Sequence, residues 1–197
     1  MDVKSTGWHY LKNAREQVLW KVEGLPERDQ RMPLTPTGTN LLGVVKHLAG
    51  VEAEYFGMCL GRPWPQPMAF WADDAQPNDD MWATADESPA QILDLYRQVT
   101  AFADETIAPL PLDTRAHVPW WREPDTTLHH LLVHMTAETA RHAGHLDILR
   151  EQVDGQAGWS PEHPNLPEGG ADYWAAYVAR LREIADRLGE IVATDGP

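Results

Sequence analysis

Apolar residues recur every three to four positions in five stretches of the chain, which is the period of an amphipathic helix. Several boundaries carry helix signals, because Asn40 and Ser88 are good N-caps and Gly24 is a common helix terminator. No stretch shows the alternation of a half-buried strand, so the pattern predicts an all-α protein. The predicted helices cover about residues 6–22, 41–60, 89–108, 126–153 and 171–192.

The spacing of these helices predicts an up-and-down four-helix bundle with an additional C-terminal helix. The bundle is expected over residues 1–155, and residues 156–197 are expected to form a Pro- and Gly-rich linker and a helix packed on the same domain. The segments 61–87 and 109–125 read as loops, and the first is long enough to suggest a functional role. Their tryptophans either cover a pocket or pack a dimer: Trp64, Trp71, Trp82, Trp120 and Trp121.

Charge narrows the classes of partner. The chain has 16 Lys and Arg against 30 Asp and Glu, a net charge of −14. Phosphate backbones and anionic membranes attract clustered cations, so we expect neither a nucleic acid nor a membrane surface as a partner. The sequence contains no run of 18 apolar residues, the length that a membrane-spanning helix needs, and its first residues lack the apolar core of a signal peptide. Cys59 is the one cysteine in the sequence, so it has no partner for an internal disulfide. Together these features predict a cytoplasmic protein.

Histidine supplies the candidate chemistry, because five of the nine histidines lie between residues 129 and 145. Glu138 and His142 are four residues apart on a predicted helix, so they lie one above the other about 6 Å apart on its apolar side. A buried carboxylate requires a partner. His47 lies on the apolar face of the second helix, and with the other two it makes a two-histidine, one-carboxylate set that leaves coordination positions open. The alternative is that Glu138 pairs with Arg141 or with a protonated histidine.

Three neighbours are candidates for other roles. His134, one turn before Glu138, either holds Glu138 in place, or acts as an acid–base group near the metal, or is a packed or hydrogen-bonded histidine. His145, at the edge of the same face, either contacts a substrate or is simply part-exposed. Arg141 either binds a substrate carboxylate or pairs with a local acid.

Two strings carry a resemblance to a known family. LLGVVKHLAGVE (41–52) and HMTAETARHAGHLDILRE (134–151) resemble the DinB-like superfamily, which includes mycothiol-dependent maleylpyruvate isomerase and an actinobacterial domain-of-unknown-function branch. The resemblance covers about residues 6–155. It implies a four-helix bundle, often a homodimer, that holds a divalent metal, with zinc as the first expectation and nickel, iron or manganese as alternatives. By match to the family pattern, the ligands are His47, Glu138 and His142.

The same resemblance implies a function. Its members include transferases and isomerases that use a low-molecular-weight thiol such as mycothiol or bacillithiol, so we expect transfer of such a thiol to a small electrophile. Many relatives have Gln where this chain has His145, and the large C-terminal domain of the isomerase has no counterpart in residues 156–197. The alternatives are a non-catalytic metal- or ligand-binding or stress-related bundle protein, and a metal-dependent hydrolase.

Overall fold

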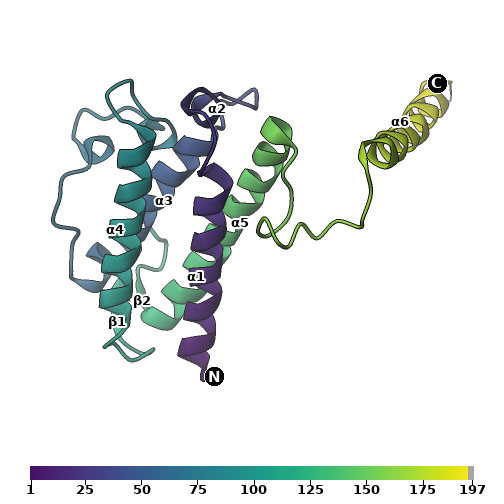
Figure 1. Cartoon of the computed structure of the whole chain (residues 1–197). Helices are drawn as coiled ribbons and strands as arrows, with labels where there is room; N and C mark the ends of the chain where they lie inside the picture. Colours follow the sequence, from purple (N-terminus) through teal and green to yellow (C-terminus); the bar gives the residue numbers. More distant parts are fainter. Residues whose placement is uncertain (195–197) are drawn as a thin grey trace. The chain divides into compact units, whose positions relative to one another are not determined.

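The computed structural model describes the backbone of residues 1–194 and the side chains of residues 1–187. It divides into two compact units, Met1–Pro164 and Asn165–Pro197 (Figure 1). Four long helices form the first unit, and helix α6 (Ala171–Thr194) forms the second. The long helices are α1 (Val3–Val22), α3 (Leu41–Tyr55), α4 (Pro89–Ile107) and α5 (Leu128–Asp154). The predicted all-α bundle with an additional C-terminal helix is therefore confirmed.

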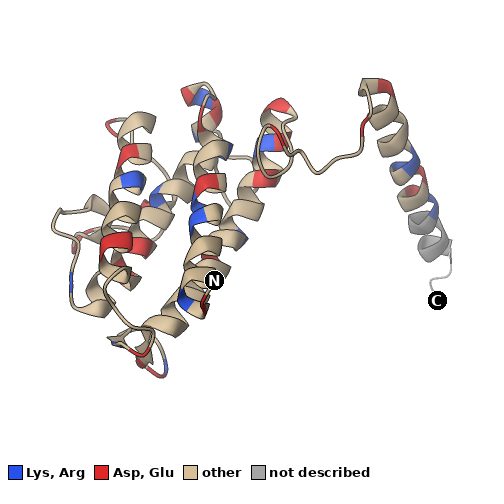
Figure 2. Ribbon diagram, turned by 60° about the horizontal axis from the view of Figure 1, so that its bottom comes forward, with Lys and Arg blue, Asp and Glu red and all other residues tan. Residues whose placement is uncertain are grey.

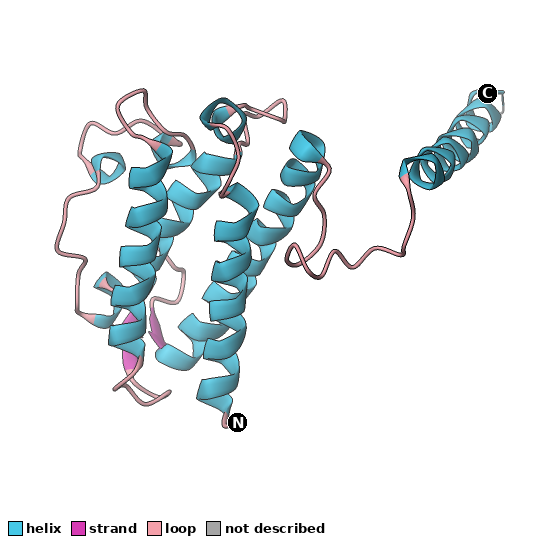
Figure 3. Cartoon of the chain, viewed as in Figure 1, coloured by secondary structure: helices cyan, strands magenta, loops and turns pink. Residues whose placement is uncertain are grey.

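Shorter elements lie between the long helices (Figure 3). They are the helix α2 (Glu27–Arg31), the 3-10 turns η1 (Met58–Leu60), η2 (Ala69–Trp71) and η3 (Asp79–Met81), and the strands β1 (Arg115–His117) and β2 (Asp125–Thr127). The strands pair antiparallel, with Ala116 opposite Thr126. Neither α2 nor the hairpin was predicted from the sequence, because three to five residues are too few to show a hydrophobic period.

The predicted caps hold at two helix starts. The Asn40 side chain accepts a hydrogen bond from the Gly43 N–H at 2.8 Å, and Ser88 forms a capping box with Gln91. The other differences are local. Helix α5 begins at residue 128 and not 126, because residues 125–127 belong to the hairpin. Helix α3 ends at Tyr55 and not at residue 60, and a separate 3-10 turn covers 58–60.

The helix directions differ from a simple up-and-down order in one place. Helices α3 and α4 run parallel, because Lys46 near the start of α3 bonds Glu87 just before α4, while Arg62 after α3 bonds Thr106 at the end of α4. The segment 56–88 returns the chain along the length of the bundle (Figure 1). Helices α1 and α5 also run parallel, since the Arg150 guanidinium donates to the Trp20 carbonyl at their C-terminal ends.

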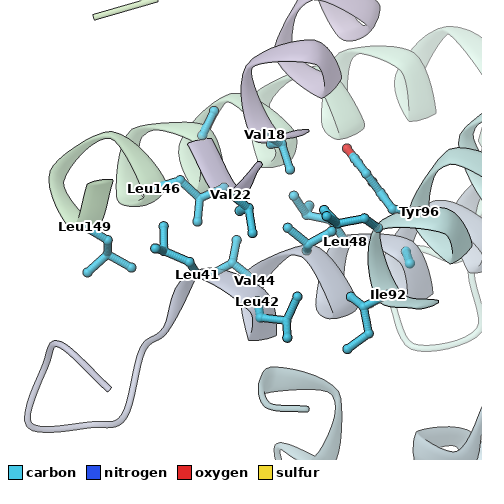
Figure 4. Close-up of a cluster of buried hydrophobic side chains, with 14 of the residues drawn as sticks. Val18, Val22, Leu41, Leu42, Val44, Leu48, Ile92, Tyr96, Leu146 and Leu149 are labelled. Carbon is cyan, nitrogen blue, oxygen red and sulfur yellow. The ribbon is translucent and has the colours of Figure 1, made fainter. Parts of the chain in front are cut away.

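Apolar side chains from all four long helices fill the interior. One cluster joins Val22 on α1, Leu48 on α3, Tyr96 on α4 and Leu146 on α5 (Figure 4). A second cluster, which includes Leu132, fills the end of the bundle next to the hairpin. Burying one such side chain contributes about 1.5–3 kcal/mol, so these clusters fix how α3 faces α5.

A buried group of charges lies on the core side of α3. Arg15 donates two hydrogen bonds of 2.7 Å to the two carboxylate oxygens of Glu52, and a third of 2.7 Å to Asp104. Asp104 also accepts from the Trp8 indole N–H at 2.7 Å and lies 3.3 Å from Lys12 Nζ. Arg15 and Glu52 are buried, Asp104 is part-exposed and Lys12 is exposed; we call Arg15, Glu52 and Asp104 the buried ion cluster. Every carboxylate in it has a cation, and Glu52 is fully buried.

Charged residues elsewhere recur over the helices and loops, with Lys and Arg interspersed among Asp and Glu (Figure 2). Within the described residues, no helix has both the length and the apolar character needed to cross a bilayer. Helix α6 carries the apolar side chains Tyr173, Tyr177 and Leu181 at helical spacing, all exposed. The expectation that the C-terminal helix packs on the bundle stays a prediction.

Candidate metal centre

His47 on α3 and two side chains on α5, Glu138 and His142, converge at one edge of the bundle. His142 Nε2 lies 3.0 Å from Glu138 Oε1, and His47 Nε2 lies 3.8 Å from the same oxygen. The two imidazole rings are 4.9 Å apart between centroids. One ligand atom from each residue lies within 4.8 Å of the other two. We call these three residues the triad.

The triad lies at the margin of the core. The side chains of His47, Glu138 and His142 are 21%, 29% and 12% exposed. From the sequence, Glu138 was expected among buried apolar neighbours. In the structure, the buried side of α5 is centred on residues such as Leu132, Thr139 and Leu146, and Glu138 borders it. Solvent and small molecules therefore reach the carboxylate.

Asp80 orients one of the imidazoles. Its Oδ2 lies 2.6 Å from His47 Nδ1, so in the tautomer where Nδ1 donates the proton, the Nε2 lone pair faces Glu138. A carboxylate on the outer nitrogen is the usual way in which proteins fix a histidine that ligates a metal. For His142 the outer atom, Nδ1, is buried and has no hydrogen-bond partner in the structure. The two imidazoles are therefore held unequally.

The segment 78–87 is fixed to α3, which explains why Asp80 reaches His47. A Cβ at Gly43 would lie 1.8 Å from the Met81 carbonyl oxygen, so only glycine permits this approach. The Asn40 amide donates to the same Met81 carbonyl, and Lys46 Nζ donates to the Trp82 carbonyl at 2.9 Å. These contacts bring Asp80 in the turn η3 to the triad.

Burial sets the charge state of the second imidazole. It lowers the pKa of His142, and the nearby His47 lowers it further, while Glu138 acts in the opposite direction. A lowered pKa favours neutral imidazole near pH 7, and neutral imidazole is the form that ligates a metal.

The two measured distances to Glu138 are compatible with a shared divalent ion. Ligand atoms about 2.0–2.2 Å from a shared ion lie about 3.0–3.5 Å apart when the angle between them is 90–110°. The observed separations of 3.0 and 3.8 Å bracket that range. Two nitrogens and one carboxylate oxygen suit zinc and its neighbours in the first transition row, and they leave coordination positions free.

An aromatic group continues the site along both helices. His134, one turn before Glu138, lies against Tyr55 and Trp121, with ring centroids 4.8 and 5.0 Å away. The Tyr55 hydroxyl oxygen accepts hydrogen bonds from the indole N–H groups of Trp120 and Trp121 at 3.2 and 3.1 Å. Burial lowers the pKa of His134, Glu138 opposes that shift, and His130 adds to it. Two of the loop tryptophans thus contact the group beside the triad.

The remaining candidates lie at the surface or outside the site. His145 is exposed, with its ring 5.2 Å from that of His142. Arg141 is also exposed and has no ion pair among the described side chains. Cys59 is buried, and burial together with Glu54 raises the pKa of its thiol to about 11, which keeps the thiol protonated at neutral pH.

Asp80 and Tyr55 were not predicted from the sequence as part of the site. Asp80 belongs to an acidic loop with no periodicity, and its contact with His47 depends on the glycine at position 43. Tyr55 is eight residues after His47, two turns along the same helix, and that spacing was the available signal.

Comparisons with known proteins show the fold and the family. No curated protein sequence matches the chain. A crystal structure of a conserved protein from Enterococcus faecalis is similar, with a TM-score of 0.59 and 15% identity, over 79% of this chain and 99% of that one. At this identity the likeness shows the fold alone. The model of the mycothiol-S-transferase family matches residues 8–155, which include all three triad residues and almost all of the four-helix bundle. The chain therefore belongs to the mycothiol-S-transferase family, a DinB-like family.

Proposed function

We propose that this chain is an enzyme that transfers a low-molecular-weight thiol of the mycothiol type to a small electrophile, with a divalent ion held by His47, Glu138 and His142. The observation that carries the proposal is the convergence of three ligand atoms at an accessible edge of the bundle. Family membership supports the choice of thiol. Zinc is the first candidate for the ion, because the donors are two imidazoles and one carboxylate.

The bound ion would supply one effect, a lower pKa for a thiol that it contacts. The chain's own groups do the rest. Asp80 holds His47 in one tautomer, and Glu138 brings a negative charge between the two imidazoles. In the transfer, sulfur loses its proton and forms one S–C bond to the electrophilic carbon. The sulfur proton goes to a neutral imidazole of the protein. In a substitution, the bond between that carbon and the leaving group breaks and the leaving group departs with the electron pair; in an addition, the π bond of the electrophile breaks and the atom that receives its electron pair takes up the proton.

We assign the proton relay to His134. Burial and the neighbouring His130 lower its pKa despite Glu138, so the ring is neutral at pH 7 and accepts a proton. His145 and Arg141 are exposed on the same helix near the triad. In this proposal they bind an anionic group of the electrophile, Arg141 through its guanidinium. The resemblance also supports a homodimer as the working form.

Metal content and turnover test the proposal together. Protein purified without added metal should contain about one transition-metal ion per chain, and zinc should raise the melting temperature of chelator-treated protein. With mycothiol and a panel of electrophiles, such as a maleimide and a chlorodinitrobenzene, the metal-loaded protein should form thioether and the chelated protein should not. Metal binding without turnover on any electrophile would favour a binding protein, and turnover that does not respond to metal would contradict the role of the triad.

A further inference from the structure

A cavity of about 460 Å³ lies along α3 on the C-terminal side of His47. Its wall on α3 includes Ala53, Glu54 and Met58 just beyond the helix, and its other wall comes from the loop 61–87. His47 and Glu54 are seven residues apart, so they share a helix face and lie about 10.5 Å apart along the axis. The remaining lining residues are Pro63, Trp64, Gln66 and Trp71.

The loop wall is held against the helix. A Cβ at Gly50 would lie 2.8 Å from the Phe70 ring and 3.8 Å from Trp71 Nε1, so the glycine admits both aromatic side chains. Trp64 packs edge-on against Phe102 of α4, with centroids 5.2 Å apart. The two indoles that line the cavity are therefore positioned by contacts behind them, which lowers the entropy lost when a ligand binds.

Two polar side chains that line the cavity, Glu54 and Gln66, make no hydrogen bond or ion pair with other described side chains. Burial raises the pKa of the Glu54 carboxyl, His47 opposes that rise and Asp80 adds to it. Glu54 therefore interacts electrostatically with two groups of the metal centre. A cavity with mostly apolar walls and a few free polar groups is typical of a small-molecule site.

Indole faces together with a free carboxyl and a free amide suit a ring that carries several hydroxyl groups. The C–H face of such a ring packs on an indole, and its hydroxyls donate to carboxylate and amide oxygens. Mycothiol has this chemistry, because its acetylated cysteine is joined by an amide to a glucosamine that carries inositol. A simple hydrophobic electrophile would leave the polar groups of Glu54 and Gln66 without partners.

The separation between the triad and the cavity matches the length of such a thiol. In an extended cysteinyl amide, sulfur lies about 3 Å from Cα, and the next carbon lies about 3.8 Å beyond Cα across the amide. The sugar ring then begins about 6–7 Å from sulfur. A sulfur atom at the triad therefore places the start of the ring between the triad and Glu54, which lies about 10.5 Å from His47 along the axis, and the rest of the thiol extends from there toward Glu54.

We propose that this cavity, between Trp64 and Trp71 and above Glu54, is the subsite for the sugar portion of the thiol. The proposal rests on the proposed thiol transfer, and it assigns the neighbouring aromatic group of Tyr55, Trp121 and His134 to the electrophile. Trp71 packs on the sugar ring, and the side-chain oxygens of Glu54 and Gln66 accept hydrogen bonds from its hydroxyl groups.

Binding of S-methyl mycothiol, measured by calorimetry on the metal-loaded protein, tests the subsite without any transfer. The sulfur of this thioether carries no proton, so binding does not depend on thiolate formation. Trp71→Ala should weaken binding by about tenfold or more, in line with the loss of one stacking partner. Glu54→Gln should weaken it by about three- to tenfold. The matched control is Trp82→Ala, an exposed tryptophan of the same loop outside the cavity, which should stay within about twofold of wild type.

Kinetics separate this subsite from the proposed function. Trp71→Ala should raise KM for mycothiol and leave KM for N-acetylcysteine, which has no sugar, unchanged. If the variants weaken binding of the thioether but wild-type protein transfers no thiol, the subsite stands and the proposed function fails. If wild-type protein transfers mycothiol and both cavity variants retain wild-type binding and KM, the subsite fails alone. The subsite would also be overturned if Trp82→Ala weakened the affinity for the thioether as much as Trp71→Ala does, or if the thioether did not bind to wild-type protein.

Discussion

The two sides of α3 carry charged groups in contrasting arrangements. On the core side, the buried ion cluster pairs Glu52 with Arg15 through two hydrogen bonds, and no carboxylate oxygen of Glu52 is left free. On the opposite side, the triad brings two histidines to one carboxylate oxygen, with contacts of 3.0 and 3.8 Å. The first set satisfies itself within the protein. The second set has ligand atoms within 4.8 Å of one another, an arrangement that could hold a metal ion, and the first set does not leave its carboxylate free for one.

Breaking the buried ion cluster should give the largest effect. Glu52→Ala leaves the buried Arg15 guanidinium with Asp104 as its one acidic partner, so the free energy of unfolding should fall by about 3–5 kcal/mol. Urea denaturation at pH 7 measures this loss. The double variant Arg15→Met, Glu52→Leu is the control and should recover much of it, because apolar residues replace both charges. A loss below about 1 kcal/mol for Glu52→Ala would remove the contrast between the two sides.

Breaking the triad should remove metal and leave the fold. His142→Ala should reduce the metal content from about one ion per chain to below about 0.1. The metal-free variant should unfold within about 1 kcal/mol of the metal-free wild type, since the triad lies at the margin of the core. Elemental analysis and denaturant titration provide the two readouts. His145→Ala is the matched control on the same helix and should keep its metal; retention of metal by His142→Ala would show that the ligand assignment is wrong.

Releasing the hydrogen bond behind His47 should weaken the site without abolishing it. Asp80→Asn should lower metal affinity by about 10- to 100-fold, or about 1.4–2.8 kcal/mol, because His47 loses the carboxylate that fixes its tautomer. Competition with a chromophoric chelator gives the affinity. Asp73→Asn removes the same charge from an exposed position in the same loop and serves as the control. Equal losses in the two variants would indicate a general effect of loop charge.

The smallest expected effect concerns the attachment of the loop that carries Asp80. Burial would raise the pKa of Glu87, but hydrogen bonds from Lys46 and the Thr84 N–H outweigh it and lower that pKa below its unfolded value of 4.5. The stabilisation is therefore present above about pH 4.5 and is lost as pH falls through the folded pKa. Glu87→Gln should cost about 1 kcal/mol at pH 7 and much less at pH 3. An equal cost at both pH values would contradict the charge-based attachment.

Hydrophobic periodicity predicted the four long bundle helices and α6, because each runs for fifteen or more residues. It also placed Glu138 and His142 on one side of α5 and His47 on the facing helix. Hydrophobic periodicity could not predict that α3 and α4 run parallel, since the period is the same whichever way a helix runs. The direction becomes visible only from pairs distant in sequence, such as Lys46 with Glu87 and Arg62 with Thr106.

The groups around the triad were harder to predict, and for a different reason. Asp80 lies in an acidic stretch where Asp73, Asp74 and Asp79 are equivalent by sequence. The choice among them is made by the close approach of Met81 to Gly43, which is a tertiary contact. The same holds for Trp71, whose place at the cavity depends on the absence of a side chain at Gly50.

The parallel pair of α1 and α5 has a consequence for how the chain folds. These helices close the bundle through contacts that join residues about 130 positions apart, such as the bonds from Arg150 to the carbonyls of Trp20 and Lys21. A nascent chain on the ribosome cannot complete this core until residue 154 has emerged. Until then, the apolar side of α1 stays exposed to solvent. We therefore expect the bundle to fold more slowly than helical proteins of similar size whose contacts are local.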